Sequence, residues 1–329
     1  MTIPAAADPV ASSSLLLRAA AEAAGRQQYP AGALYVVATP IGNLADLSLR
    51  AIHVLALADA VACEDTRHSA PLLRHLGLQG KPLVAVHEHN ERDAAPAVLA
   101  RLARGERVAY VSDAGTPAVS DPGAALVAAA RAAGHRVLPI PGASAALAAL
   151  SAAGDARATA WRFAGFLPAK AGERGAALAE LLARPEAQVL FEAPHRIAAL
   201  CAELAADGPA RSVTLCRELT KQFESIVTLP ALDLPAWLAA DAQRARGEFV
   251  LVLHAPEALP AGERDLDATL RPLLAELPLK QAVALAAQIS GAPRNALYRR
   301  ALALKTPGAD GAGATATIDD EADPRTTPP

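Results

Sequence analysis

Residues 108–134 read VAYVSDAGTPAVSDPGAALVAAARAAG and combine three kinds of local pattern. The apolar run at 108–111 predicts a buried strand, and the Ala-rich run at 123–134 predicts a helix that ends at Gly134. Between them, SDAGTPAVSDPG (112–123) consists almost entirely of small residues, prolines and two aspartates, which contribute little to a core. A strand followed by a loop and a helix is the repeating unit of an α/β fold.

The same alternation extends in both directions along the chain. Short apolar runs separated by Ala- and Leu-rich helical segments occur at LYVVA (34–38), AVACE (60–64), PLVAV (82–86), VLPI (137–140), WRFAGFL (161–167), QVLFEA (188–193), SVTLCREL (212–219) and GEFVLVLH (247–254). This pattern predicts two α/β domains, the first of them built around a mainly parallel sheet.

The domain boundaries follow from changes in this pattern. We expect a loose extension at 1–30, an N-terminal α/β domain at 31–155, a second α/β domain at 156–256, a linker at 257–275, a small helical domain at 276–305 and a disordered tail at 306–329. Within the small domain, two short helices are expected to meet at a turn at Gly291.

Composition excludes several classes of protein. The chain has 329 residues, 52% of them hydrophobic, but it lacks an apolar run of the ~20 residues needed to cross a membrane. No secretory signal is recognisable at the start, and the three cysteines contain no CxxC pair, so we expect a cytoplasmic protein without disulfides or a zinc site. The net charge of −3 gives no global support for a nucleic-acid partner, so such a partner would require local basic patches.

Three loops of the first domain share an unusual composition. TPIGN (39–43), SDAGTPAVSDPG (112–123) and PGASA (141–145) each follow a predicted strand, and ligands of open α/β sheets bind at the carboxyl ends of strands. Small residues allow a ligand to approach the main chain. Ordinary turns with a helix cap at Asp121 are the simpler interpretation of any one loop, but three such loops at one edge of the sheet favour a ligand site. The loops contain neither a GxGxxG nor a GxxxxGK[ST] motif and no Lys or Arg, which favours an uncharged or cationic ligand over a polyphosphate.

Several motifs resemble, in order, those of the small-subunit ribosomal RNA methyltransferase I family. They are TPIGNLADLSLRA (39–51), CEDTRHSAPLLRHLG (63–77), HEHNE (87–91), SDAGTPAVSDPG (112–123), PGASAALAALSAAG (141–154), FAGFLPAK (163–170), LFEAPHRI (190–197), CRELTKQFE (216–224) and GEFVLVL (247–253). The resemblance covers about residues 34–300 and implies the tetrapyrrole methylase fold, with S-adenosylmethionine bound in a cleft between two α/β domains. It also implies 2′-O-methylation of a cytidine ribose in 16S rRNA near the decoding centre, within the 30S subunit, by a homodimer.

The resemblance also implies positions for the cofactor and for catalysis. The cofactor is expected against Pro40, Asp113, Gly115, Thr116, Val119, Ser144, Ala145, Phe166 and Glu192. The expected catalytic residues are Glu64, Asp65, Glu192 and Lys221, and those expected to contact RNA are Arg67, His87, His89, Lys170, His195, Arg196, Arg217, Arg299 and Arg300.

Each of these residues also has a simpler structural interpretation. The segment Glu64–Arg67 is compatible with a helix cap and a local ion pair. For Lys221 two functional roles stay open: binding a phosphate, or accepting a proton if burial lowers its pKa. His87 and His89 alternate as a metal-binding pair would, but without a third ligand no metal is expected. The identity of the general base stays open, and Glu88 and Glu218 are further candidates for it.

Two segments carry local positive charge. Residues 157–174 contain four cations against one acid, and 279–305 contains five cations and no acid, namely Lys280, Arg294, Arg299, Arg300 and Lys305. Either segment is a candidate for phosphate binding, and a solvated helix face is the alternative. Two other functions stay open at this point: methylation of a tetrapyrrole or other small metabolite, and a non-catalytic role in RNA binding or assembly.

Overall fold

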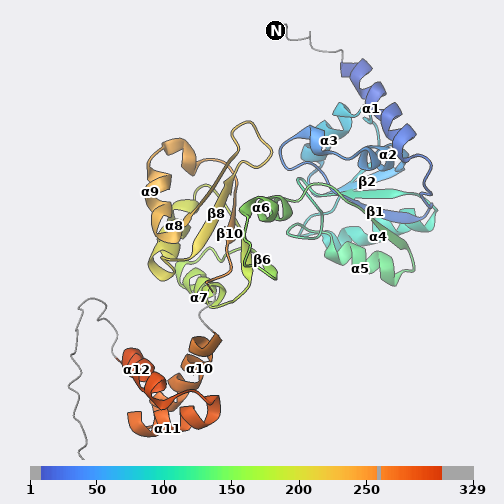
Figure 1. Ribbon diagram of the computed structural model, residues 1–329. Coiled ribbons are helices and arrows are strands. Elements are labelled where there is room, and N and C mark those ends of the chain that lie inside the picture. Colours follow the sequence, from blue (N-terminus) through green and yellow to red (C-terminus); the bar gives the residue numbers. More distant parts are fainter. Residues whose placement is uncertain (1–8, 258–260, 306–329) are drawn as a thin grey trace, which may run out of the picture. The chain divides into compact units, whose positions relative to one another are not determined.

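The computed structural model describes residues 9–257 and 261–305, and the side chains of 13–257 and 266–304 (Figure 1). The chain divides into two units, Met1–Pro256 and Glu257–Pro329. The first unit contains both α/β domains expected from the sequence, and the second contains the C-terminal helices. The expectations for residues 1–8 and 306–329 lie outside the described residues.

The first sheet has five strands in the order β3-β2-β4-β1-β5, and all of its pairs are parallel. Its strands are β1 (Ala33–Val37), β2 (Ala60–Cys63), β3 (Leu83–Ala85), β4 (Val108–Val111) and β5 (Arg136–Ile140). The helices between them are α2 (Leu49–Leu57), α3 (Thr66–His75), α4 (Glu91–Ala103) and α5 (Ala124–Ala132). This confirms the predicted parallel α/β arrangement for the first domain.

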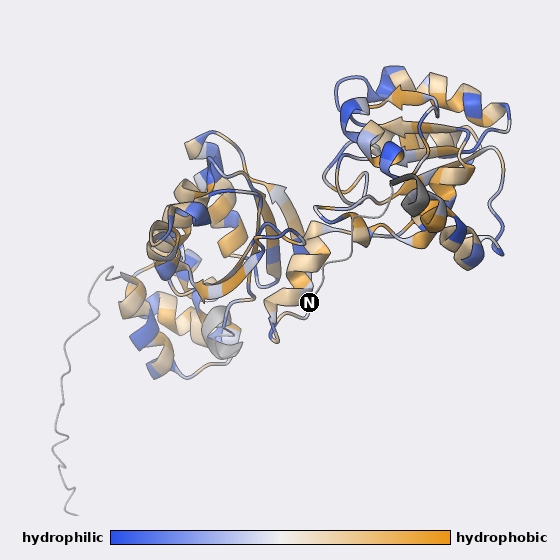
Figure 2. Cartoon of the chain, turned by 90° about the horizontal axis from the view of Figure 1, so that it is seen from above, coloured by the Kyte–Doolittle hydropathy of each residue, from blue (hydrophilic) through white to orange (hydrophobic). Residues whose placement is uncertain are grey.

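Two apolar clusters cover the two faces of this sheet. Successive strand residues point to opposite faces, so Tyr35 packs with α2 in one cluster whereas Leu34 packs with α4 and α5 in the other. Both tyrosines of the strands, Tyr35 and Tyr110, are fully buried. Figure 2 shows hydrophobic colouring on the strands and mixed colouring on the helices, as expected for helices that bury one side only.

The expected loose extension at 1–30 is wrong for residues 9–24, which form helix α1 (Pro9–Ala24) against α2. Its buried or partly buried residues Ser13, Leu17, Ala20 and Ala24 recur with helical spacing. Because most of these side chains are small, the hydrophobic periodicity of this segment was too weak to predict a helix.

The second sheet has the order β6-β7-β10-β8-β9 and is mixed. Its strands are β6 (Trp161–Phe166), β7 (Ala187–Glu192), β8 (Ser212–Arg217), β9 (Ser225–Pro230) and β10 (Phe249–Leu253). Only β6 and β7 are parallel, so this sheet differs from the all-parallel first sheet. The connection between β8 and β9 is too short for a parallel crossover, which requires a dozen residues or more.

The helices of the second domain are α7 (Ala171–Leu182), α8 (Ile197–Asp207) and α9 (Leu234–Ala239), and they form a core with the sheet. Short 3₁₀ turns occur at Leu44–Asp46, Ala231–Asp233 and Ala242–Ala245. Helix α6 (Ala145–Ala153) was assigned to the first domain, yet its Ala146, Ala149 and Ala153 pack in a cluster with β7, β8 and β10. Alanine at these positions lets the helix approach the second sheet closely, so α6 joins the two halves of the unit.

The second unit consists of α10 (Ala261–Glu276), α11 (Leu279–Ser290) and α12 (Arg294–Lys305), around a core that includes Leu270, Val283 and Leu297. The linker expected at 257–275 is therefore wrong from residue 261 onward. The predicted turn is confirmed: Gly291 caps α11 in the left-handed conformation, with φ 68°. Within the described part of the chain, no helix combines the length and apolarity needed to span a membrane.

Candidate functional site

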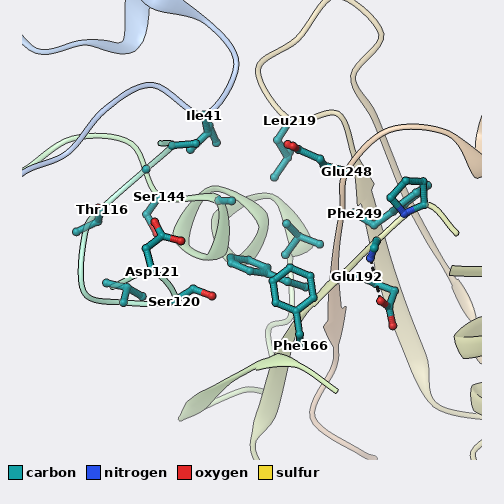
Figure 3. Close-up of a pocket in the computed structure, with 18 residues that line it drawn as sticks. Ile41, Thr116, Ser120, Asp121, Ser144, Phe166, Glu192, Leu219, Glu248 and Phe249 are labelled. Atoms are coloured by element: carbon teal, nitrogen blue, oxygen red, sulfur yellow. Dashed lines mark hydrogen bonds between the residues drawn. The ribbon is translucent and has the colours of Figure 1, made fainter. Parts of the chain in front are cut away.

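A cavity of about 420 Å³ lies within the first unit, between the loops of the first sheet and the strand ends of the second (Figure 3). We call it the first cavity. The first domain, up to the start of α6, contributes Ile41, Ala114, Gly115, Thr116, Val119, Ser120, Asp121, Ser144 and Ala145. The second domain contributes Phe166, Phe191, Glu192, Ala193, Pro194, Leu219, Glu248, Phe249 and Val250.

The three small-residue loops are joined to one another by hydrogen bonds. The main chains of Thr39 and Gly115 donate to each other's carbonyls at 2.8 and 3.0 Å, and the Thr116 hydroxyl donates to the carbonyl of Ala143 at 3.0 Å. Gly115 has φ 83°, and a Cβ at this position would lie 3.3 Å from Ile41 Cγ2. The loops therefore form one wall of the first cavity.

Glu91 fixes the far end of the β4–α5 loop, a role that the sequence did not suggest. Its Oε1 accepts hydrogen bonds from the amides of Gly123 and Leu126, at 3.0 and 2.8 Å, at the start of α5. The hydroxyl of Tyr110 donates to the carbonyl of Pro122 at 2.7 Å. Glu91 lies 32 residues from Gly123 in sequence, so no local pattern could have revealed this contact.

Glu192 brings a buried carboxylate to the opposite wall. Its side chain is 0% exposed, and Oε1 accepts from the amide of Ala193 at 2.8 Å and faces Arg196 Nε at 3.1 Å. Its Oε2 has no hydrogen-bond partner among the described residues. A buried carboxylate oxygen without a partner is costly. Because this oxygen is closed to solvent, the Glu192 carboxylate lies behind the wall of the cavity, beside Arg196.

Arg196 was expected to contact substrate, but its guanidinium is engaged within the protein. It donates to the carbonyls of Leu167 and Pro168, at 2.6 and 3.1 Å, and pairs with Glu192. It therefore holds the end of β6 beside the end of β7. Arg217 is engaged similarly, donating to the carbonyls of Arg246 and Phe223 at 2.6 and 3.0 Å.

Lys221 does not have the lowered pKa that a general base would need. Burial lowers the pKa of its amine, but hydrogen bonds to Glu218 at 2.8 Å and Glu248 at 3.0 Å outweigh that effect and raise it. The amine is therefore a charged member of an ion-pair network. Glu218 and Thr220 have φ of 53° and 67°, a strained conformation that places Leu219 in the wall of the first cavity.

A second cavity of about 370 Å³ lies at the carboxyl end of β2 and β4 and is lined by Glu64, Asp65, Thr66, Arg67, Ala85, His87 and Asp113. It brings together two of the predicted catalytic residues, Glu64 and Asp65, with Arg67 and His87, which were expected to contact RNA. Burial raises the pKa of the Glu64 carboxyl, the direction expected of a group that accepts a proton near neutral pH.

Asp65 has the structural role that the helix-cap interpretation assigns. Its Oδ1 accepts from the amide of Arg67 at 2.7 Å and caps α3, and its carboxylate pairs with the Arg67 guanidinium. These hydrogen bonds lower the pKa of Asp65 to about 2. The carboxylate is thus a weak base, and Glu64 is the stronger candidate of the two.

Asp113 lines the second cavity and not the first, which differs from its expected place beside the cofactor. Its Oδ1 accepts from the amide of Asp65 at 3.2 Å, and its Oδ2 lies 2.6 Å from Nδ1 of His68. The hydrogen bond to Asp113 raises the pKa of His68, which was not among the predicted site residues. The other aspartate of the loop, Asp121, faces the first cavity, and burial raises the pKa of its carboxyl.

The remaining predicted residues are dispersed. Pro40 lies beside the wall residue Ile41 but does not itself line the first cavity, and His195 is exposed next to Pro194. The ring of His89, which is exposed, is 6.2 Å from that of His87. Lys170 is exposed and pairs with Glu173 at 3.1 Å. In the second unit Arg299 is exposed, whereas Arg300 forms two hydrogen bonds with Asp267, at 2.7 and 2.8 Å.

Comparison with known proteins adds independent information. The family described as Tetrapyrrole (Corrin/Porphyrin) Methylases matches residues 33–235, and the one described as the RsmI C-terminal HTH domain matches 260–305. The chain is 49% identical to ribosomal RNA small subunit methyltransferase I of Pseudomonas aeruginosa, over 83% of this chain and 97% of that protein. It is 48% identical to the protein of that name from Escherichia coli O157:H7, over 82% of this chain and 95% of that protein.

A solved structure of similar fold, the methyltransferase CobJ, is 22% identical to the chain with a TM-score of 0.52, covering 68% of this chain and 94% of that one. This likeness supports the fold alone. The match over most of the chain's length and the agreement in fold carry the assignment of family. The chain belongs to the ribosomal RNA small subunit methyltransferase I family, within the tetrapyrrole methylases, and is an S-adenosylmethionine-dependent methyltransferase.

Proposed function

We propose that the chain transfers a methyl group from S-adenosylmethionine, held in the first cavity, to the 2′-hydroxyl of a cytidine ribose in 16S rRNA. The observation that carries this proposal is the first cavity itself, in which a wall of small-residue loops faces the strand ends of the second sheet, with the carboxylate residue Asp121 and the aromatic residues Phe166 and Phe191 in its lining. The relatives named above are ribosomal RNA small subunit methyltransferases, which supports ribosomal RNA as the substrate.

The composition of the first cavity suits this cofactor. S-adenosylmethionine carries a sulfonium cation, an amine and an adenine ring. The lining of the cavity includes the carboxylate residue Asp121 and the aromatic residues Phe166 and Phe191, whose ring centroids are 5.7 Å apart. The loop with Gly115 and Thr116 leaves main-chain groups within reach of the ligand. Val119, Ser144 and Ala145, which were expected to contact the cofactor, line the same wall, and this supports the proposal.

Catalysis then depends mainly on alignment. Positioning the ribose oxygen in line with the methyl group contributes up to ~7–11 kcal/mol, and a general base adds roughly 10²–10⁴-fold. Within this proposal the second cavity receives the acceptor nucleotide, because Asp113 lines it while the following residues, Ala114 and Gly115, line the first. Glu64 is the proposed base, since burial raises its pKa.

The partner in this proposal is the small ribosomal subunit, and the chain acts as a homodimer, as the family resemblance implies. The C-terminal unit is proposed to contact RNA through Lys280, Arg294 and Arg299, which are all exposed. We expect R294A/R299A to reduce the salt dependence of RNA binding, measured by filter binding, without changing the affinity for S-adenosylmethionine. An unchanged salt dependence would argue against this role for the unit.

One methylation assay tests the central proposal. The chain is incubated with methyl-labelled S-adenosylmethionine and, separately, with 30S subunits, naked 16S rRNA or a corrinoid precursor, and the RNA is digested to nucleosides for mass spectrometry. Label in 2′-O-methylcytidine supports the proposal. Label in the corrinoid alone would favour the small-metabolite alternative, and label in no acceptor, despite cofactor binding, would favour a non-catalytic role.

A further inference from the structure

Helix α3 exposes a basic face beside the second cavity. The helix reads TRHSAPLLRH and contains no acidic residue, and its four basic side chains Arg67, His68, Arg74 and His75 are all exposed. Arg67 and Arg74 are seven positions apart, as are His68 and His75, and seven residues make about two turns of a helix. The four side chains therefore lie on one side of α3, whereas Ser69 and Leu73 are buried on the other. The resulting surface extends from one end of α3 to the other.

The positions of these basic residues along the helix differ in how well they suit the helix dipole. Arg74 and His75 in the last turn are accounted for by the partial negative charge at a helix C-terminus. The same rule disfavours cations in the first turn, where Arg67 and His68 lie. Each is held there by a carboxylate, Arg67 by Asp65 and His68 by Asp113, and both carboxylates line the second cavity.

The charges of the second cavity and of its rim are opposite in sign. Inside are the carboxylates of Glu64, Asp65 and Asp113, which repel phosphate but accept hydrogen bonds from the hydroxyls of a ribose or the amino group of cytosine. At the rim, the Arg67 side chain is 87% exposed and begins the basic face of α3. This arrangement separates a place for a nucleoside from a place for phosphates.

We infer that the exposed face of α3, formed by Arg67, His68, Arg74 and His75, binds phosphates of the RNA strand whose acceptor nucleotide enters the second cavity. This inference rests on the proposed function. The seven residues from Arg67 to Arg74 span about 10 Å at 1.5 Å per residue. One strand of duplex DNA carries a phosphate about every 3.4 Å along its axis, and on that scale the face is long enough to bind more than one phosphate of a nucleic-acid strand.

The test compares two exposed arginines that occupy equivalent places. Arg74 is in the last turn of α3, the helix whose first turn lines the second cavity, and Arg131 is in the last turn of α5. Neither arginine forms an ion pair within the described part of the chain. Binding of the full chain to 16S rRNA is measured over a series of salt concentrations for wild type, R74A/H75A, R74K and R131A. Calorimetry with S-adenosylmethionine provides the control for folding and for the first cavity.

We expect R74A/H75A to make the negative slope of log affinity against log salt less steep by about 1 to 2, close to one for each phosphate that the variant no longer neutralises. R74K keeps the charge and should retain the slope, as should R131A, and all variants should bind the cofactor as wild type does. A slope for R74A/H75A equal to that of R131A would overturn the inference while leaving the proposed function intact. If the wild-type chain binds the cofactor but neither binds nor methylates the RNA, the proposed function and this inference both fail.

Discussion

The first cavity is lined mainly by apolar side chains and by main chain, whereas the second is lined mainly by charged side chains. Both nevertheless use the same loop between β4 and α5. Gly115, Thr116 and Asp121 of this loop face the first cavity, and Asp113 faces the second. The comparison teaches that the two aspartates of one short motif line different cavities, because the loop runs between the two cavities.

The largest effect should come from filling the first cavity at Gly115. In G115V the backbone at position 115 would keep a positive φ that valine disfavours, and the new side chain would contact Ile41 in the wall of the cavity. Overpacking of this kind costs about 1–3 kcal/mol. We expect the affinity for S-adenosylmethionine, measured by calorimetry, to fall about ten- to hundredfold. G134V is the matched control, since Gly134 has a similar φ of 81° but a Cβ there meets nothing within 4 Å. Equal cofactor affinity in the two variants would contradict the assignment of the first cavity as the cofactor site.

The next test separates the two aspartates. Loss of a hydrogen bond to a charged group costs about 1.5–3 kcal/mol, so D121N should weaken cofactor binding about tenfold or more. D113N should instead leave cofactor affinity near the wild-type value and lower the rate of RNA methylation by a similar factor. Calorimetry and the methylation assay measure the two effects separately. If D113N weakened cofactor binding as much as D121N, the division of the loop between two cavities would be incorrect.

A smaller effect is expected from Glu91, which fixes the end of the shared loop. E91A removes the carboxylate that caps α5, a change worth about 0.5–2 kcal/mol of folding free energy. For a chain of this size, thermal unfolding should shift downward by roughly 2–4 °C per kcal/mol. Glu88, exposed in the same segment, provides the control variant E88A. A melting temperature for E91A no lower than that of E88A would contradict the capping role.

The smallest effect concerns the pH dependence of His68 at the second cavity. Its hydrogen bond to Asp113 raises the pKa above the ordinary 6.5, with further contributions from the charge of Asp113 and, in the same direction, Asp65, while Arg67 acts in the opposite direction. The contribution to stability is therefore complete below pH 6.5 and is lost as the pH rises through the folded-state pKa. An NMR titration should show this pKa fall in D113N. An unchanged pKa would mean that the contact does not exist in solution.

The sequence alone determined the first sheet and the small-residue loops that are proposed to bind the cofactor. Apolar runs such as VAYV (108–111) are buried on both faces, so their pattern is visible without tertiary information, and the small-residue loops follow directly from them. The order of these motifs was also sufficient to indicate the family. These features are local or repeat along the chain, which is why they can be read from it.

Tertiary structure decided how those residues were distributed. The contact of Glu91 with Gly123, the pairing of His68 with Asp113, and the network that raises the pKa of Lys221 each join residues distant in sequence, or depend on how the chain turns between them. The mixed second sheet and helix α1 were also missed, because strand order and the packing of small side chains depend on the partners that folding brings together. The hydrogen bonds and burial that assign a charged residue its role are properties of its neighbours in space, and the chain's linear order does not specify them.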